Sequence, residues 1–450
     1  MQVASSFVAR TAAGVVLLGL AGVVVAAAIQ PRPPGNPIGA VASPSSPAPT
    51  GAAGRGVASV DERVAFWETR VAASATDYSS TIALVDAYLD RVRAIGDLSD
   101  LGRAETALVR AQALAPTGDV RLLLRQGQVA FTHHDFTAAR AAADAALQRD
   151  PGNETAVALL GDAAIELGDE AAAIEAYRQL APLAATPQVL SRLARYDLLV
   201  GDVEAAETKM REAIEAAIGD GFADQVAFHR YQLAELLRGE NRIEEAAAAH
   251  ETILRDMPDH VPALGGLGRM REAQGRRAEA IELLERATDR VPTPQLVADL
   301  GDLHALAGDA DRAAAAYALV ERIAEVAQAT GGVYDRQLIL FLADHDLRTD
   351  DAVALAEAEI AVRRDVYGYD ALAWALYRDG RLTEADAAAR EAQRLGTPDG
   401  RILYHAGLIA AALGHDDEAS HLLTRAVLHE AALPPLQVPA LHAALEALGR

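Results

Sequence analysis

Three short clusters in the sequence combine histidine with aspartate, the residue types that could hold a metal ion or move a proton. The clusters are His133-His134-Asp135, Asp344-His345-Asp346 followed by Asp350-Asp351, and His415-Asp416-Asp417 followed by His421. Adjacent histidines in a turn seldom converge on one ion, and none of the clusters has the ligand spacing of a zinc site or a calcium loop. We interpret them as solvated turns and expect neither a metal nor another cofactor.

One of these clusters keeps an alternative interpretation open. Asp344, His345, Asp346 and Asp350 fall in an irregular part of the chain. Carboxylates beside a histidine could support an enzyme or a metal-dependent module. Metal bound tightly at unit stoichiometry would favour this alternative.

Other signals of catalysis are scarce. The chain has no cysteine, its only lysine is Lys209, and beyond residue 100 serine occurs only at Ser191 and Ser420. No G-x-S-x-G motif is present, and His250-Glu251 does not continue into H-E-x-x-H. Gly266-Leu267-Gly268 lies in a predicted helix with no strand before it, so it is not a phosphate loop. The sequence predicts a protein that is not an enzyme.

The composition favours an all-α fold. The chain has 450 residues, of which 51% are hydrophobic but only 4% aromatic, and about a fifth are alanine. Alanine favours closely packed helices over strands. The net charge of −23 argues against nucleic acid as a partner, because phosphate backbones attract Lys and Arg.

The first 56 residues differ from the rest. Residues 12–29 are uncharged and apolar or small, and they end in Ala26-Ala27-Ala28. We expect residues 1–30 to be either an N-terminal membrane anchor or a signal peptide cleaved near Ala28, and in both cases the body to be exported. Residues 31–56 are rich in Pro, Gly, Ser and Ala and read as a flexible, disordered linker. We expect contact with the membrane only through the N-terminal segment.

Small residues recur in phase along the remaining chain. They occur in pairs twelve residues apart, at Gly127/Ala139, Gly161/Ala173, Ala194/Ala206, Ala234/Ala246, Gly268/Ala280, Gly301/Ala313, Ala373/Ala385 and Gly407/Ala419. The first members follow one another by 34, 33, 40, 34, 33, 72 and 34 residues. Paired Gly and Ala let the two helices of a hairpin approach closely. A period near 34 indicates an array of helical hairpins.

This pattern resembles that of tetratricopeptide-repeat proteins. The resemblance implies an all-α, right-handed superhelix with about ten repeats over residues 79–430, of which 79–116 and 330–366 are degenerate. Residues 57–78 and 431–450 are expected to form N- and C-terminal caps, because an end repeat otherwise exposes its stacking face. The strings Tyr369–Tyr377 and Leu403–Gly407 are similar to those of bacterial exported repeat proteins of undefined function.

The resemblance also implies which side chains face the concave groove. The ninth repeat would place Tyr367, Asp370, Trp374, Tyr377 and Arg378 there, the last Arg401 and Tyr404, the second Gln128 and Phe131, and the fourth Arg195. Aromatic residues and arginine dominate binding energy at interfaces. In the alternative interpretation, Trp374 and Tyr377 pack against the next repeat instead.

Together these features predict a non-catalytic scaffold of the cell envelope that binds a segment of a partner protein in its groove. The partner is a protein or peptide whose identity the sequence does not give. Co-chaperone members of the family clamp a peptide carboxylate with lysine and asparagine. With one Lys and three Asn (Asn36, Asn153 and Asn241), none of them suitably placed, this chain cannot build that clamp.

Overall fold

The computed structural model describes residues 59–95, 99–183, 186–221, 223–329, 332–333 and 336–449, together with Val15–Val16. The predicted anchor or signal segment and the predicted linker lie outside the described residues, apart from Val15 and Val16. These two form β1 (Val15–Val16), which pairs in parallel with β2 (Gly332–Val333). None of the helices in the described ranges combines the length and apolarity that a bilayer-spanning segment needs.

Helices make up the rest of the regular structure. They are α1 (Val60–Ala73), α2 (Tyr78–Ile95), α3 (Ser99–Leu114), α4 (Val120–Thr132), α5 (Phe136–Leu147), α6 (Glu154–Glu166), α7 (Glu170–Leu180), the 3-10 helix η1 (Ala181–Leu183), α8 (Pro187–Leu199), α9 (Val203–Asp220), α10 (Ala223–Gly239), α11 (Ile243–Asp256), α12 (Val261–Ala273), α13 (Arg277–Arg290), α14 (Pro294–Leu306), α15 (Ala310–Ala329), α16 (Arg336–Asp344), α17 (Thr349–Val362), α18 (Val366–Arg378), α19 (Leu382–Ala392), α20 (Gly400–Ala412), α21 (Asp416–Val427), the 3-10 helix η2 (Glu430–Ala432) and α22 (Gln437–Ala447).

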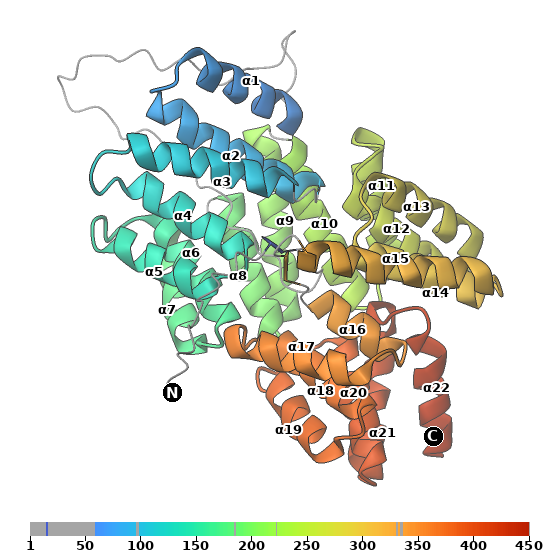
Figure 1. Cartoon of the computed structure of the whole chain (residues 1–450). Coiled ribbons are helices and arrows are strands. Elements are labelled where there is room, and N and C mark those ends of the chain that lie inside the picture. The colour runs from blue at the N-terminus through green and yellow to red at the C-terminus, as the bar shows by residue number, and fades with distance from the viewer. Residues whose placement is uncertain are drawn as a thin grey trace, which may run out of the picture.

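Successive helices pair as hairpins, from α2/α3 to α20/α21, and each hairpin stacks on the next (Figure 1). Helix α1 packs on α2 at one end, and α22 packs on α21 at the other. The prediction of an all-α solenoid of helical hairpins, wound as a right-handed superhelix, is confirmed.

The turn inside a hairpin needs one residue with positive φ. In nine hairpins that residue is His134, Gly168, Gly201, Asn241, Gly275, Gly308, Asp346, Gly380 or Gly414. An aspartate often follows and caps the second helix. The carboxylate of Asp135, for example, accepts from the backbone N–H of Ala138 at 2.9 Å, and such caps satisfy an otherwise unpaired donor of the first turn.

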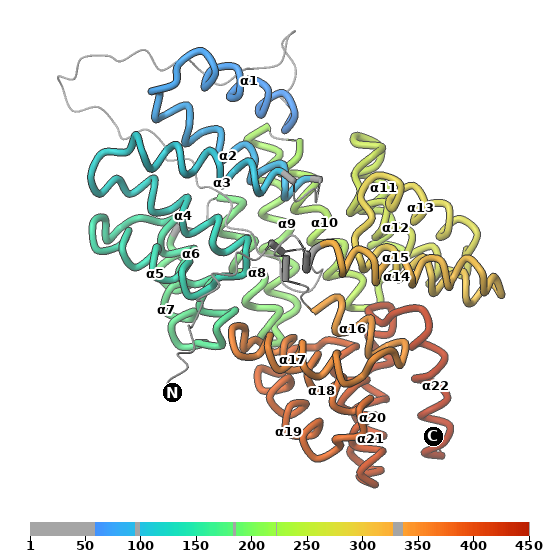
Figure 2. Tube along the Cα trace, in the orientation of Figure 1, coloured from blue at the N-terminus to red at the C-terminus, as the bar shows by residue number. Residues whose placement is uncertain are grey.

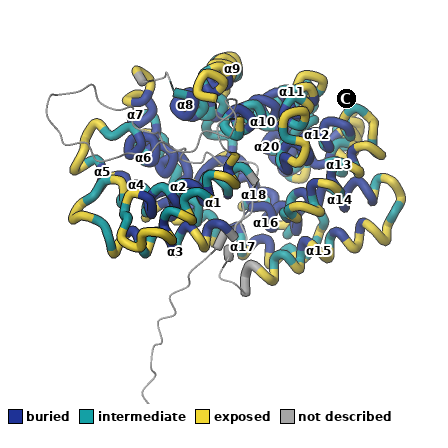
Figure 3. The backbone as a smooth tube through the Cα atoms, turned by 90° about the horizontal axis from the view of Figure 1, so that it is seen from above, coloured by how far each residue is buried: buried dark blue, intermediate teal, exposed yellow. Residues whose placement is uncertain are grey.

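Small residues allow helices to touch, both within a hairpin and between neighbouring hairpins. A Cβ atom added at Gly161 would lie 2.8 Å from Cε1 of Tyr177 in the same hairpin, and one at Gly127 would lie 2.5 Å from Cδ2 of Leu159 in the next hairpin. Gly266 makes room in the same way, because a Cβ atom there would lie 2.4 Å from Nε2 of His250. Burial follows this packing, and exposed residues gather on the outer turns (Figure 3).

The superhelix curls until its C-terminal part meets its own middle. In Figure 2, one end of α17 lies next to α7 and α8, which are far from it in the sequence. Val366, Ala392 and Ile402 share one apolar cluster with Val157 and Leu199. The described helices therefore form a closed ring.

Polar contacts complete this closure. The backbone N–H of Arg364 donates to the carbonyl of Glu166 at 2.9 Å, and Oγ1 of Thr397 donates to the carbonyl of Leu199 at 2.6 Å. Nη1 of Arg238 donates to the carbonyl of Ala431 at 2.9 Å. We call these contacts, together with the ion pairs Arg363–Glu166 and Arg394–Glu170, the closure seam.

Candidate functional site

A cavity of about 230 Å³ lies inside the ring. The first helices of seven hairpins line it, from α8 to α20, together with the loops before α20 and after η2. The charged and tyrosine residues that line it are Arg195, Tyr231, Glu235, Arg238, Glu240, Arg269, Asp299, Arg336, Arg363, Tyr367, Asp370, Asp399 and Arg401. First helices face the axis of the solenoid, so the cavity is what remains of the concave groove after the ring closes.

One wall of the cavity is a buried network of three carboxylates and three guanidinium groups. Glu166 pairs with Arg195 at 2.8 Å and with Arg363 at 2.6 Å. Asp365 pairs with Arg363 at 3.0 Å and with Arg336 at 2.9 Å, and Arg336 also reaches Glu359 at 2.7 Å. Although burial opposes ionisation, the charges of Arg336 and Arg363 hold the pKa of Asp365 well below its usual range. Each charge in this wall is thus paired across the seam or beside it.

The opposite wall comes from α10, α12 and α14. Arg269 donates to Asp299 at 2.8 Å, and Arg238 donates to Glu235 at 3.0 Å. Burial works against the charge on Arg269, but the carboxylates of Asp299 and Glu235 outweigh it and raise its pKa. Burial raises the pKa of the Tyr231 hydroxyl, which therefore stays protonated at neutral pH. This wall presents a fixed cation and a neutral hydroxyl group to the cavity.

The C-terminal wall carries the third group of polar residues. A hydrogen bond of 2.9 Å joins Oδ1 of Asp370 and Nδ1 of His405. Asp399 caps α20 by accepting the backbone N–H groups of Arg401 and Ile402 at 2.9 and 3.2 Å. The Arg401 side chain has no ion-pair or hydrogen-bond partner within the described part of the chain.

Four of the residues predicted for the groove line this cavity: Arg195, Tyr367, Asp370 and Arg401. They come from α8, α18 and α20, so residues about 200 positions apart meet at one site. Burial raises the pKa of the Tyr367 hydroxyl, which stays protonated like that of Tyr231.

The other residues predicted in the C-terminal groove lie in the packing between repeats. Trp374 is 2% exposed, its ring stacks on His405 at 4.1 Å, and its Nε1 donates to Asp344 at 2.8 Å. Tyr377 stacks on the other side of Trp374 at 5.1 Å and is half-buried, and Tyr404 is buried. In this conformation, Trp374 and Tyr404 have almost no surface to offer a partner.

Three further predicted residues lie away from the cavity. Arg378 pairs with Asp346 at 2.7 Å and covers the ring of Trp374. Gln128 and Phe131 are buried in α4, where Phe131 meets the ring of Phe136 at 5.1 Å. The repeat register predicts all three side chains for the groove. Gln128 and Phe131 are buried instead, and Arg378 is paired with Asp346 away from the cavity.

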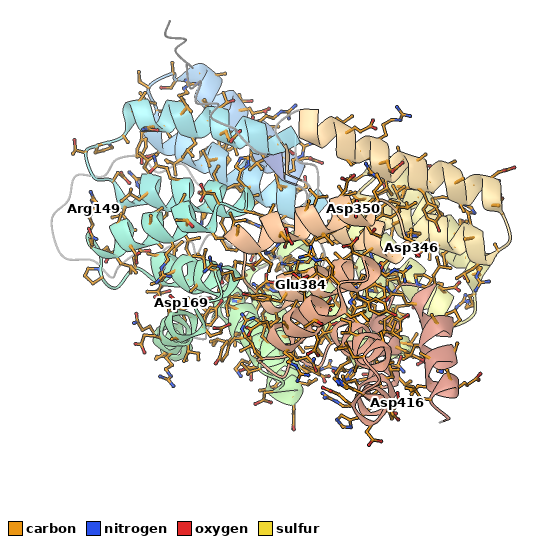
Figure 4. All side chains as sticks on the ribbon, turned by 60° about the horizontal axis from the view of Figure 1, so that its bottom comes forward. Arg149, Asp169, Asp346, Asp350, Glu384 and Asp416 are labelled. Atoms are coloured by element: carbon orange, nitrogen blue, oxygen red, sulfur yellow. The ribbon has the colours of Figure 1, made fainter. Side chains whose placement is uncertain are left out.

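The acidic and histidine cluster of the eighth hairpin does not converge. Asp344 accepts from Trp374, Asp346 pairs with Arg378, and Nε2 of His345 meets Asp302 at 2.8 Å. Figure 4 places Asp346 and Asp350 beside each other but far from Asp416 of the last turn. Among the described residues, no group of three or more His, Asp or Glu could hold a metal ion.

His345 instead belongs to a small hydrogen-bonded set. The Tyr317 hydroxyl also donates to Asp302, at 2.9 Å, and Nδ1 of His345 contacts the carbonyl of Phe341 at 2.8 Å. Burial lowers the pKa of His345, but its hydrogen bond to Asp302 outweighs that effect and raises the pKa overall. The set joins hairpins α14/α15 and α16/α17, which is a structural role.

Sequence reasoning missed Arg238, Arg269, Arg336 and Arg363, together with Tyr231. A signal for Arg269 was present, because it directly follows the phased small residue of its repeat, as Arg195 does. At this register position, five consecutive repeats alternate in charge: Asp162, Arg195, Glu235, Arg269 and Asp302. Arg336 and Arg363 come from the degenerate repeat and its following loop, where the register gives no guidance.

Comparison with family models decides the family. Residues 89–153 and 124–189 match one model described as a tetratricopeptide repeat, and residues 237–300 match a second model of the same description. The chain is a tetratricopeptide-repeat protein. Tetratricopeptide repeats form concave surfaces, so the fold supports a protein–protein interaction scaffold in general.

Several solved structures match the chain at low identity. PilW, a type IV pilus biogenesis factor, is 19% identical with a TM-score of 0.38, covering 46% of this chain and 94% of its own. PilF of Pseudomonas aeruginosa is 17% identical with a TM-score of 0.38, covering 45% and 91%. Human IFIT1, solved as a dimer with PPP-AAAA, is 16% identical with a TM-score of 0.44, covering 82% and 94%. Among curated proteins, no sequence matches the chain.

Proposed function

We propose that this tetratricopeptide-repeat protein is a non-catalytic scaffold of the cell envelope that binds a segment of a partner protein on the inner face of its ring. The observation that carries the proposal is the cavity, where Arg195, Tyr367 and Arg401 gather from distant repeats. Arginine and tyrosine bring large contact area and directed hydrogen bonds to an interface. The inner face is therefore the part of the molecule best equipped to recognise a ligand.

Export rests on the sequence alone. The apolar run of residues 12–29 and the linker of residues 31–56 would place the ring outside the cytoplasm, either tethered or released. Residues 1–56 carry three arginines and no acid, so the body has a charge of −23 − 3 = −26. A body this acidic is repelled by anionic lipid and nucleic acid, which supports a protein partner.

The absence of assembled chemistry supports a non-catalytic role. In the described residues, the cluster that favoured an enzyme or a metal-dependent module is divided among Trp374, Arg378 and Asp302. The polar side chains that line the cavity are arginine, carboxylate, amide and tyrosine groups together with Thr397, whose hydroxyl donates to the carbonyl of Leu199 and is not paired with a base. These side chains are suited to binding a ligand.

Site-specific crosslinking in cells tests this function. We expect a photo-crosslinking residue at position 401 to capture one discrete envelope protein, because this position faces the cavity. The matched control places the same residue at Arg255, which is exposed on α11. Equal capture from both positions, or recovery of the full-length chain in the cytosolic fraction, would refute the proposal.

A further inference from the structure

The cavity walls hold more hydrogen-bond donors than they use. Nη1 of Arg195 and Nη2 of Arg269 are buried, and neither has a hydrogen-bond partner in the described residues. The Arg401 guanidinium group on the third wall likewise has no hydrogen-bond or ion-pair partner among the described residues. An unsatisfied buried donor costs about 1–3 kcal/mol, and more for a charged group, unless water or a ligand accepts its proton.

The carboxylates of the cavity are already engaged. Asp299 accepts from Arg269 at 2.8 Å and from Gln295 at 2.7 Å, and Asp399 accepts from two backbone N–H groups. Asp370 is paired with His405 and Glu235 with Arg238. Oε1 of Glu235 is the exception, because it has no hydrogen bond, but the unused donors still outnumber this acceptor. An oxyanion would supply several acceptors.

We infer that the cavity binds an oxyanion, either a carboxylate or a phosphate group, between Arg195, Arg269 and Arg401. The inference rests on the proposed function in placing the ligand on the inner face, and it adds the chemical class of the group recognised there. Guanidinium groups suit both oxyanions, because two parallel N–H bonds match their geometry.

The cavity also limits the size of the ligand and indicates a second polar group on it. A cavity of about 230 Å³ admits a small organic anion or the end of a chain but not a folded domain. Glu235 lines the same cavity, and its Oε1 has no hydrogen bond, although His250 lies 3.7 Å away. A hydroxyl group beside the oxyanion would satisfy this acceptor, so a hydroxylated anion fits best.

Such a ligand would also couple the two sides of the closure seam. Arg195 belongs to α8 and Arg401 to α20, and these helices meet only because the ring closes. An anion held by both arginines binds the closed ring and not an opened one. Binding must therefore raise the stability of the closed form.

Calorimetry and thermal unfolding of the purified chain test the inference with citrate and inorganic phosphate at constant ionic strength. We expect saturable binding of at least one probe with a rise in Tm, and at least tenfold weaker binding by Arg401→Gln. Arg401→Gln leaves no acid unpaired, so it should fold, and Arg401→Lys should retain part of the affinity. Arg255→Gln, on the outer surface, is the matched control and should bind like the unaltered chain.

The outcomes separate the two chemical sources. Binding of citrate alone identifies a carboxylate ligand, and binding of phosphate alone identifies a phosphorylated one. No saturable binding of either probe overturns the inference, as does equal weakening in Arg401→Gln and Arg255→Gln. Because these measurements use no partner, their failure would leave the crosslinking test of the scaffold intact.

Discussion

Contacts within the hairpins and contacts across the closure seam are built from different residues. Inside a hairpin, Gly161 meets Tyr177 and Gly301 meets Tyr317, so small residues admit larger neighbours. Across the seam, Arg363 meets Glu166 and Arg394 meets Glu170, beside an apolar cluster. The stability of a hairpin depends on the volume of the side chains between its helices. The stability of the seam depends on the pairing of its buried charges.

This difference sets what each region tolerates. A buried charge that loses its partner leaves the other charge uncompensated, which costs more than the pair itself contributes. A small residue that becomes larger strains one hairpin, and in a repeat array that strain stays local. The seam centre should therefore be the most sensitive part of the ring.

Glu166→Ala should have the largest effect of the substitutions. It removes the shared partner of Arg195 and Arg363 in a fully buried setting. We expect a loss of about 3–5 kcal/mol in the free energy of unfolding, measured by urea titration at pH 8. Small-angle scattering should show a larger radius of gyration as the seam opens. A loss below about 1 kcal/mol with an unchanged radius would contradict this view of the seam.

Acid should weaken the hairpin interiors next. Burial lowers the pKa of His229, His250 and His260 to about 4. The unfolded chain binds these protons near pH 6.5 and the folded chain only near pH 4, so stability is present above pH 6.5 and is lost as the pH falls through this window. The loss should approach roughly 3 kcal/mol per residue.

Urea titrations between pH 7.5 and 5 check this prediction. In that range most carboxylates stay ionised, so the slope of unfolding free energy against pH should report proton uptake by histidines of the unfolded chain. At least three protons are expected, because burial lowers the pKa of His134 as well. A flat profile down to pH 5 would show that the three histidines are not held neutral. An effect confined below pH 4.5 would assign acid lability to carboxylates such as those of the seam instead.

Gly161→Leu should have an intermediate effect. Any side chain at this position enters the ring of Tyr177, and overpacking of this kind costs about 1–3 kcal/mol. Gly219→Leu is the matched control, because nothing lies within 4 Å of a Cβ atom there. It should leave stability unchanged or slightly raise it, since glycine disfavours helix by up to about 1 kcal/mol. Equal losses in the two variants would mean that close approach does not determine hairpin packing.

The same comparison explains what the sequence could predict. The small-residue ladder repeats at a fixed interval, so one sequence was enough to predict the helical hairpins and to place Arg195 and Arg401 on the inner face. Trp374 obeys the same register, yet His405 and Tyr377 enclose it. The repeat register predicts the face of the helix on which a side chain lies, but it does not predict which neighbouring side chains cover it.

The closure seam was beyond sequence reasoning for a physical reason. Arg363 and Glu166 are 197 residues apart. Glu166 follows Gly161 by five residues, as Arg378 follows Ala373, but Arg363 lies in the loop after the degenerate repeat, where the register gives no guidance. Whether the ends of a superhelix meet depends on small rotations summed over many repeats, which no local pattern encodes. The cavity therefore became visible only in the structure, because its walls come from both sides of the seam.

The smallest effect should come from the rim of the seam, at Arg394. Its guanidinium group pairs with Glu170 at 2.6 Å and donates to the carbonyl of Arg364 at 2.9 Å. Both charged side chains are partly exposed, at 23% and 30%, so water replaces much of what the pair contributes. We expect Arg394→Ala to lose less than about 1 kcal/mol in urea titration, and the loss to shrink at high salt. Arg390→Ala on the outer face, where Asp386 is its partner, is the control for a surface pair outside the seam. If Arg394→Ala opened the ring as far as Glu166→Ala, sensitivity would be spread along the whole seam instead of rising toward its buried centre.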